Sequence, residues 1–157
     1  MYEMAGSFHK CKHSNRVVDS DGTEVQMFDD VPEILKVLHT SEEFSETEVA
    51  VASSTTYPQW ARSCMKLLNI DELECNLETI INYKQAIYPR NKKVHFRELT
   101  KLSGVDYEDM LFFDNESYNI REVSELGVTC IHCPEGMTWE HFERGLDSHN
   151  QMKLCNS

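Results

Sequence analysis

A short apolar run that ends abruptly on acidic and polar residues is the clearest feature of the hydrophobic pattern. It extends from Met110 to Phe113 and is followed at once by Asp114, Asn115 and Glu116. Such a run, bounded by polar residues, predicts a buried parallel strand. Open α/β sheets place their ligands at the carboxyl ends of their strands, and a carboxylate there suits Mg²⁺, which prefers oxygen ligands. The alternative is a solvated loop with ordinary acidic residues.

The rest of the pattern alternates between strands and helices. Further strands are predicted over residues 48–52 and 128–131, and a more ambiguous one over 77–83. Helices are predicted over residues 58–68, 94–102, 117–126 and 138–146, and after Asp30, which is expected to cap a helix that has Pro32 in its first turn. This alternation predicts an α/β fold, a three-layer sandwich with a mainly parallel, Rossmann-like sheet.

Residues 16–28 have a different pattern, in which apolar and polar residues alternate on both sides of Asp21-Gly22. An Asp-Gly pair in this setting favours a β-hairpin, because both central positions of its tight turn need positive φ. We therefore predict a small hairpin flap next to the α/β body. The 157 residues are long enough for one domain, with residues 1–15 and 147–157 expected to be mobile.

Composition narrows the possible functions. The formal net charge of −12 argues against nucleic-acid and anionic-membrane surfaces as partners, because it would repel both. No apolar run has the length of a transmembrane helix, and residues 1–16 lack the apolar stretch of a signal peptide. The six cysteines lack paired spacing, which favours free thiols in a reducing, cytoplasmic environment. His9, Cys11 and His13 could suggest zinc, but a second ligand group at finger-like spacing is missing.

Three segments carry groups that could act on a phosphate. The strand over 48–52 is followed by the hydroxyls of Ser53 and Ser54, a basic loop contains Lys92, and the opening run ends at Asp114. A hydroxyl and an ammonium can hold phosphate oxygens, and a carboxylate can hold Mg²⁺ beside them. Each residue also has an ordinary structural explanation, so only their combination points to phosphate chemistry.

In this order, the segments resemble the second, third and fourth motifs of the haloacid dehalogenase superfamily, and most closely its eukaryotic magnesium-dependent phosphatases. The resemblance covers roughly residues 8–146 and includes Val31-Pro32-Glu33, Val51-Ala52-Ser53, Ile87-Tyr88-Pro89, Lys92, His95-Phe96, Leu111-Phe112-Phe113-Asp114, Asn119-Ile120, Leu126-Gly127-Val128 and Gly136-Met137-Thr138. It implies a phosphatase, acting as a monomer on phosphotyrosine-like or small sugar-phosphate monoesters. Ser53 would bind the phosphoryl group, Lys92 would stabilise its charge, and Asp114 would ligate Mg²⁺.

The chain departs from the family at two of these motifs. Asn115 stands where the family usually has a second Asp; its amide oxygen can still ligate Mg²⁺, but without charge. Ser54 stands where the family often has Arg, which removes a possible bidentate phosphate contact.

The first motif of the family is the larger departure. It is Asp-x-Asp-x-Thr after a strongly apolar central strand, and its two Asp residues serve as nucleophile and general acid/base. The string Asp19-Ser20-Asp21-Gly22-Thr23 matches the motif, with Asp19 as candidate nucleophile and Asp21 as candidate acid/base. Only Val17 and Val18 precede it as apolar residues, whereas a central parallel strand needs a continuous apolar run. We therefore favour the hairpin over a working first motif.

If the hairpin forms, the chain lacks its nucleophile and the middle strand of its sheet. The strands over 48–52 and 111–113 would then face each other across the missing strand with unpaired backbone groups. A first segment missing from the sequence would explain this most simply, and we expect such a chain to be loosely packed. A phosphate- and Mg²⁺-binding pseudoenzyme is the alternative function, and a non-enzymatic receiver-type domain is a third possibility.

Overall fold

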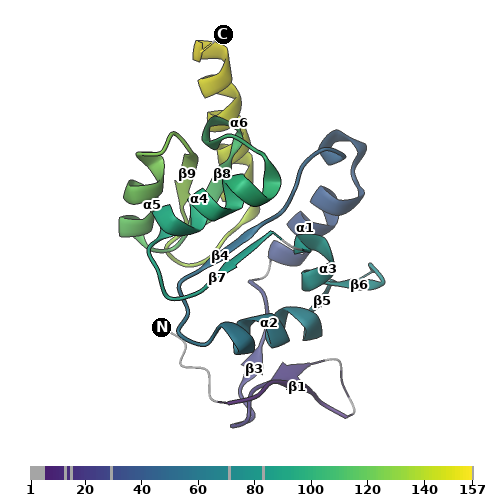
Figure 1. The fold of residues 1–157 in the computed structure, drawn as a ribbon. Coiled ribbons are helices and arrows are strands. Elements are labelled where there is room, and N and C mark those ends of the chain that lie inside the picture. The colour runs from purple at the N-terminus through teal and green to yellow at the C-terminus, as the bar shows by residue number, and fades with distance from the viewer. Residues whose placement is uncertain are drawn as a thin grey trace.

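Strands and helices alternate along the computed structural model, which describes residues 6–12, 14, 16–28, 30–70, 72–82 and 84–156 (Figure 1). The strands are β1 (His9–Lys10), β2 (Val17–Val18), β3 (Glu24–Val25), β4 (Val51–Ser53), β5 (Asn69–Ile70), β6 (Cys75–Asn76), β7 (Gln85–Ile87), β8 (Leu111–Asp114) and β9 (Thr129–His132). The helices are α1 (Val31–Thr40), α2 (Pro58–Leu67), α3 (Leu77–Ile81), α4 (Lys92–Ser103), α5 (Ser117–Ser124) and α6 (Trp139–Asn156), with 3₁₀ turns η1 (Glu42–Phe44) and η2 (Tyr107–Asp109).

The parallel strands form two separate pairs. β4 runs parallel to β7, and β8 runs parallel to β9, with Asp114 opposite His132. Within the described residues, no ladder joins β4 to β8. This separation is one of the outcomes that the sequence left open, since both strands were expected to flank a missing one and could also have closed up or paired with another segment. The fold is therefore mixed α/β with parallel strand pairs, and the predicted sheet is divided in the part of the chain that the structure describes.

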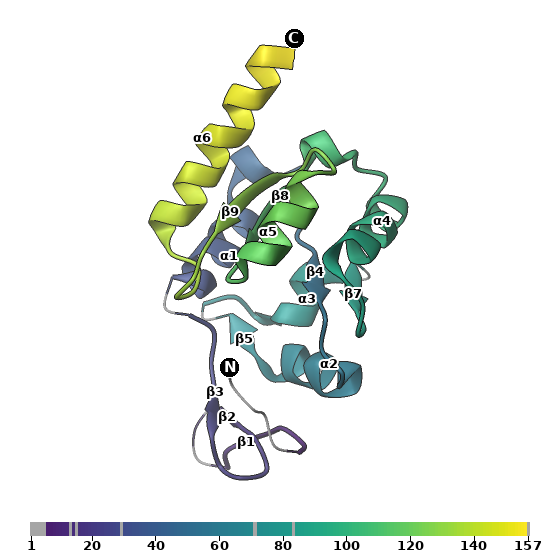
Figure 2. The ribbon, with the colours of Figure 1, turned by 90° about the vertical axis from the view of Figure 1, so that its left-hand side faces the viewer.

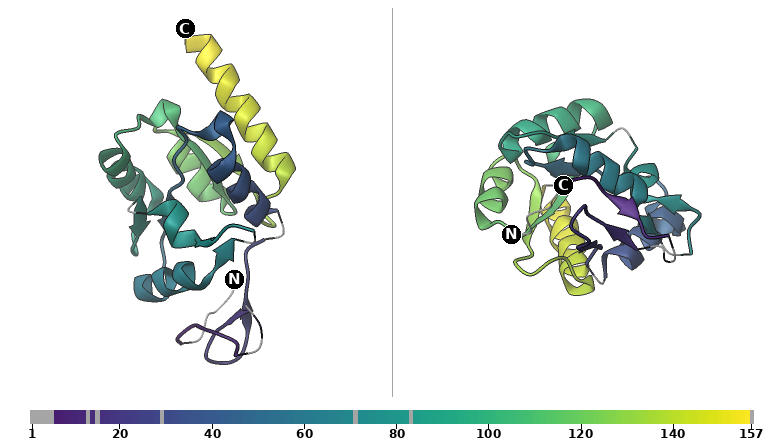
Figure 3. Two further views of the ribbon diagram at one scale, coloured as in Figure 1. Left: turned by 90° about the vertical axis from the view of Figure 1, so that its right-hand side faces the viewer. Right: turned by 90° about the horizontal axis from the view of Figure 1, so that it is seen from below.

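Helices cover the parallel strands from both sides. Figures 2 and 3 show α4 and α5 on one side and α1 and α6 on the other, with the last turns of α6 extending past the body. Phe96 of α4 packs edge-on against Phe112 of β8, with ring centroids 4.9 Å apart, in a core cluster that also contains Val123 and Ala52. Gly145 lets α6 approach β8, because a Cβ there would lie 2.9 Å from the Phe113 ring. No helix in the described ranges has the length and apolarity to span a membrane.

The hairpin prediction is confirmed. β2 and β3 pair antiparallel, with Val18 opposite Glu24. The turn itself differs from the expected one, because of its two central residues only Gly22 has positive φ, at 81°. The N–H of Gly22 donates to the carbonyl of Asp19, which makes a three-residue loop that ends on a left-handed glycine. Val17 and the neighbouring Phe8 pack the hairpin against Cys64 of α2.

One predicted strand is wrong. Residues 77–83 were expected to be extended, but Leu77–Ile81 forms α3, and Tyr83 lies outside the described residues. Asn76 caps this helix by accepting a hydrogen bond from the N–H of Thr79, a signal that outweighs the β propensity of Ile80 and Ile81. The strand that pairs with β4 lies further on, at Gln85–Ile87.

The two chain ends are also more regular than expected. The last helix was predicted over 138–146, with residues 147–157 as a mobile tail, but α6 continues to Asn156. His9–Lys10 forms β1 against β2, whereas residues 1–5, 13 and 15 lie outside the described part. Asp30 does not cap α1 with its side chain as predicted; its Oδ2 accepts the N–H of Trp139 instead, at 2.9 Å. Asp30 therefore caps α6 and ties the start of that helix to the start of α1.

Candidate active site

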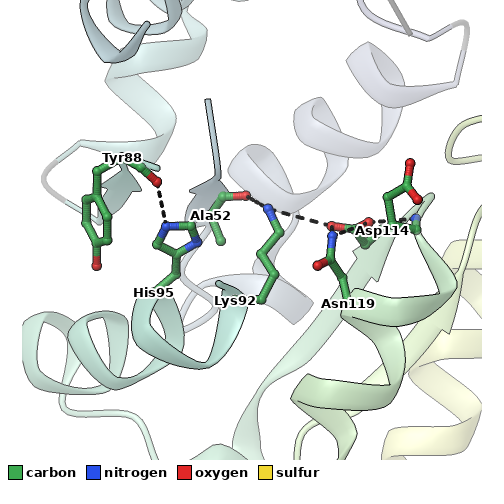
Figure 4. Close-up of polar contacts among 7 residues, drawn as sticks. Ala52, Tyr88, Lys92, His95, Asp114 and Asn119 are labelled. Carbon is green, nitrogen blue, oxygen red and sulfur yellow. Dashed lines mark hydrogen bonds and ion pairs between the residues drawn. The ribbon is translucent and has the colours of Figure 1, made fainter. Parts of the chain in front are cut away.

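The carboxyl ends of β4 and β8 meet at one buried ammonium. Lys92, the first residue of α4, donates from Nζ to the carbonyl of Ala52 at 2.8 Å, and its Nζ lies 3.8 Å from Oδ2 of Asp114 (Figure 4). The side chains of Lys92 and Asp114 are only 7% and 11% exposed. One cation therefore connects two strands that share no backbone hydrogen bond.

The environment of Lys92 opposes its charge. Burial lowers the pKa of Lys92 below its ordinary value of 10.5, and the nearby Asp114 carboxylate acts in the opposite direction. The ammonium therefore has one carboxylate at 3.8 Å and one neutral carbonyl at 2.8 Å as its partners. Because the site is buried, a bound anion would interact more strongly with this ammonium than it would in water.

Asp114 is held in place by its own loop and by α5. Its Oδ1 accepts the N–H of Glu116 at 2.7 Å, and the Nδ2 of Asn119 lies 3.1 Å and 3.2 Å from Oδ1 and Oδ2. The first contact closes the turn after β8, and the second fixes the plane of the carboxylate. Asn119 appeared in the family resemblance without a role, and its contact with Asp114 could not have been deduced from spacing alone.

Ser53, the last residue of β4, lies beside this pair in the fold. Its carbonyl accepts the N–H of Tyr88 at 3.0 Å, whereas no hydrogen bond from its hydroxyl to another described residue is seen. Ser54 and Asn115 are both exposed and follow β4 and β8 directly. The carbonyl of Asn115 accepts a hydrogen bond from Nε2 of His132 at 2.9 Å, which fixes the backbone of the loop after Asp114.

Asp19 and Asp21 lie elsewhere. Both belong to the hairpin turn, which Figure 1 shows on the far side of α2 from β8 and β9. Asp19 is 1% exposed, and its Oδ1 accepts the N–H groups of Asp21 and Thr23 at 3.0 Å and 2.8 Å. These contacts make Asp19 the acceptor that organises the turn. Asp21 is exposed at the tip of the loop.

Comparison with known proteins shows the family of the chain. Residues 1–152 match the acid phosphatase family. The chain belongs to this family. It is similar to human magnesium-dependent phosphatase 1, with 34% identity over 141 residues that cover 90% of this chain and 73% of that protein. It is also similar to a HAD-like hydrolase superfamily protein of Schizosaccharomyces pombe, with 35% identity over 117 residues that cover 73% of this chain and 64% of the relative.

Membership of the acid phosphatase family confirms the resemblance derived from the motif order. The matched region includes all three segments that meet at the site, and it also includes the hairpin. The zinc site that His9, Cys11 and His13 could suggest was not favoured by the sequence, and within the described residues no three His, Cys, Asp or Glu side chains cluster around a possible metal position. His13 of that candidate lies outside the described residues.

Proposed function

We propose that this protein binds phosphoric monoesters together with Mg²⁺ at the ends of β4 and β8 and hydrolyses them. In this proposal Ser53 and Lys92 hold the phosphoryl oxygens, with Ser54 beside them, and Asp114 and Asn115 hold the metal. The observation that carries it is the buried ammonium of Lys92, which lies between the carbonyl of Ala52 and the carboxylate of Asp114. Phosphotyrosine-like and small sugar-phosphate monoesters are the substrate class, as the family resemblance implies.

The donor set fits Mg²⁺ rather than a softer metal. It combines the Asp114 carboxylate with the amide oxygen of Asn115, and Mg²⁺ is commonly bound by one or two carboxylates together with water and substrate phosphate. Glu116 and Asn119 donate to the Asp114 carboxylate and would orient it toward the ion. The bound metal would neutralise charge on the phosphoryl group, and the chain itself would contribute the Lys92 ammonium.

The helices on both sides of the parallel pairs support a three-layer sandwich as the complete fold, closed by one strand between β4 and β8. The six cysteines are all free in the structure, which fits a monomer that works in the cytoplasm. Both points remain part of the proposal.

A second function is favoured by one specific observation. The Asp19 carboxylate is buried and accepts two amides of its own turn, so it is engaged where a nucleophile would need to be open. Without another carboxylate at the strand ends, the site would bind phosphate and Mg²⁺ without transferring the phosphoryl group. This is the pseudoenzyme alternative.

Hydrolysis of an aryl phosphate with and without Mg²⁺ tests the proposal, alongside titration with inorganic phosphate. We expect Mg²⁺-dependent phosphate binding that is lost in Asp114→Ala and retained in Glu108→Ala, an acidic residue of η2 outside the site. Turnover in the same sample would establish the enzyme, whereas binding without turnover would establish the pseudoenzyme. Phosphate binding that does not respond to Asp114→Ala would contradict both.

A further inference from the structure

The last two carbonyls of β4 are both held from the β7–α4 segment. Lys92 Nζ donates to the carbonyl of Ala52, and the N–H of Tyr88 donates to the carbonyl of Ser53. Tyr88 follows β7 directly and Lys92 begins α4, so the position of the strand end depends on how Tyr88 is fixed relative to that helix. A small shift of Tyr88 would move Ser53 relative to the ammonium.

His95 fixes Tyr88 to α4. Its Nε2 lies 2.9 Å from the carbonyl oxygen of Tyr88, an oxygen that also accepts the N–H of Arg90 at 2.9 Å (Figure 4). The Tyr88 ring meets the imidazole edge-on, with centroids 4.5 Å apart. His95 is three residues after Lys92, a spacing that places both side chains on one face of the helix. The backbone of Tyr88 therefore connects Ser53, through its N–H, to His95, through its carbonyl.

The protonation state of His95 follows from these contacts. A carbonyl oxygen can only accept, so Nε2 carries the proton in this hydrogen bond and Nδ1 of the neutral ring is bare. His95 is 0% exposed, and its Nδ1 has no partner among the described residues. Burial and the neighbouring Lys92 charge lower the pKa of His95, which favours the neutral ring. An apolar side chain would avoid the cost of the unpaired nitrogen, so what the imidazole adds at this position is its one N–H donor.

We propose that His95 is a positioning residue that, through the backbone N–H and carbonyl of Tyr88, fixes the Ser53 backbone relative to Lys92 so that both reach the same phosphoryl group. The phosphate-binding part rests on the proposed function. The hydrogen-bonded sequence His95 Nε2 to Tyr88 carbonyl, and Tyr88 N–H to Ser53 carbonyl, stands on geometry alone. His95 itself is assigned no contact with substrate.

Three variants distinguish the effect of losing the His95 N–H donor from the effect of changing the volume of the side chain. His95→Gln can keep an N–H directed at the Tyr88 carbonyl, whereas His95→Leu removes it and fills the same space. Tyr88→Phe is the matched control, because it removes the 2.5 Å hydrogen bond from the Tyr88 hydroxyl to Glu98 and leaves the peptide contacts in place. Two quantities are measured by NMR on each folded variant: the hydrogen-exchange rate of the Tyr88 amide and the affinity for inorganic phosphate.

We expect His95→Leu to accelerate Tyr88 amide exchange and weaken phosphate binding, each by about tenfold, the upper end of what one hydrogen bond contributes. His95→Gln and Tyr88→Phe should stay within about twofold of the unmodified protein, a change too small to represent a lost hydrogen bond. A merely structural histidine would instead make the Gln and Leu variants alike. The inference is overturned if the two behave alike, or if Leu leaves Tyr88 exchange unchanged.

Two further results keep the test decisive. If the unmodified protein does not bind phosphate, the proposed function fails, and the Tyr88 exchange series alone decides the role of His95. If His95→Leu does not fold, the ¹⁵N shifts of His95 in the unmodified protein take its place. A protonated Nε2 with bare Nδ1 supports the arrangement, and the opposite tautomer contradicts it.

Discussion

Asp114 and Asp19 begin with the same local arrangement and end in different ones. Each follows a short apolar strand, and in each the Oδ1 atom accepts the N–H two residues further on, that of Glu116 or Asp21. Asp19 then accepts a second amide from its own loop, that of Thr23. Asp114 also meets Asn119 from α5 and Lys92 from α4. The strand-end position and the amide contact two residues on are common to both residues, so they do not by themselves indicate a site. The convergence of α4 and α5 on Asp114 makes it a candidate for chemistry.

Removing the Lys92 ammonium should have the largest effect on phosphate affinity. Lys92→Met takes away the ammonium that joins the ends of β4 and β8, and we expect phosphate affinity, and any hydrolysis, to fall by about 10²- to 10³-fold, the range for loss of one stabilising donor. Lys93→Met is the matched control, because Lys93 is the next residue and pairs with Glu125 at the surface. Phosphate titration of both variants measures the difference. Equal affinities would remove Lys92 from the site.

The second test removes the Asn119 amide, which contacts the Asp114 carboxylate from α5, and leaves the carboxylate itself in place. Asn119→Leu deletes the amide that donates to both oxygens of Asp114, and we expect Mg²⁺ affinity to fall by about 10- to 100-fold, as for other residues that orient a ligand. Calorimetric titration with Mg²⁺ measures this. Tyr118→Phe, one residue earlier and exposed, should leave the affinity unchanged. An unchanged Mg²⁺ affinity in Asn119→Leu would mean that the Glu116 amide alone orients Asp114.

The third test addresses the hairpin turn whose amides Asp19 accepts. Asp19→Ala leaves the N–H groups of Asp21 and Thr23 without their acceptor, and we expect the free energy of unfolding to fall by about 1–3 kcal/mol. Phosphate affinity should not change. Asp21→Ala, at the exposed tip, should alter stability by less than about 0.5 kcal/mol. Urea unfolding and phosphate titration of both variants check these values. Loss of Mg²⁺-dependent turnover in a fully folded Asp19→Asn would instead make Asp19 the nucleophile.

The sequence predicted the parts of the site that depend on local pattern. The apolar run before Asp114, the strand before Ser53 and the helix predicted over 94–102 all form, because run length and flanking polar residues determine them. Lys92 was expected in a basic loop before that helix, but it is the first residue of α4, since Asn91 caps the helix by accepting the N–H of Val94. It failed at α3, where the capping Asn76 decides the conformation, and at β7, whose three residues are too few to show a period. The extent of α6 was also missed, because its last turns are polar and project from the body.

The supporting contacts of the site could not be predicted in the same way. His95 and Asn119 lie within motifs that the sequence singled out, but their partners are a backbone carbonyl and a carboxylate that only the packed helices bring near. A helical spacing of three residues between Lys92 and His95 is the one available signal. It indicates a shared face and says nothing about what lies opposite that face.

The smallest expected effect is a change in the pH dependence of stability, and it tests the buried contacts around Lys92 from a different direction. Burial lowers the pKa of His95 below its ordinary value of 6.5; the neighbouring Lys92 charge acts in the same direction, while the Tyr88 carbonyl and Glu98 oppose it. As the pH falls below 6.5, the unfolded state therefore binds a proton before the folded state does, and stability decreases until the lowered pKa is reached. The unmodified protein should lose more stability between about pH 7.5 and 5 than His95→Gln, which has no such proton to bind.

His149 also has a lowered pKa because of burial, so the comparison is made in a His149→Gln background. Urea unfolding across this range gives both curves, and parallel curves would show that the folded state accommodates the charged imidazole, against the neutral ring inferred from the Tyr88 carbonyl.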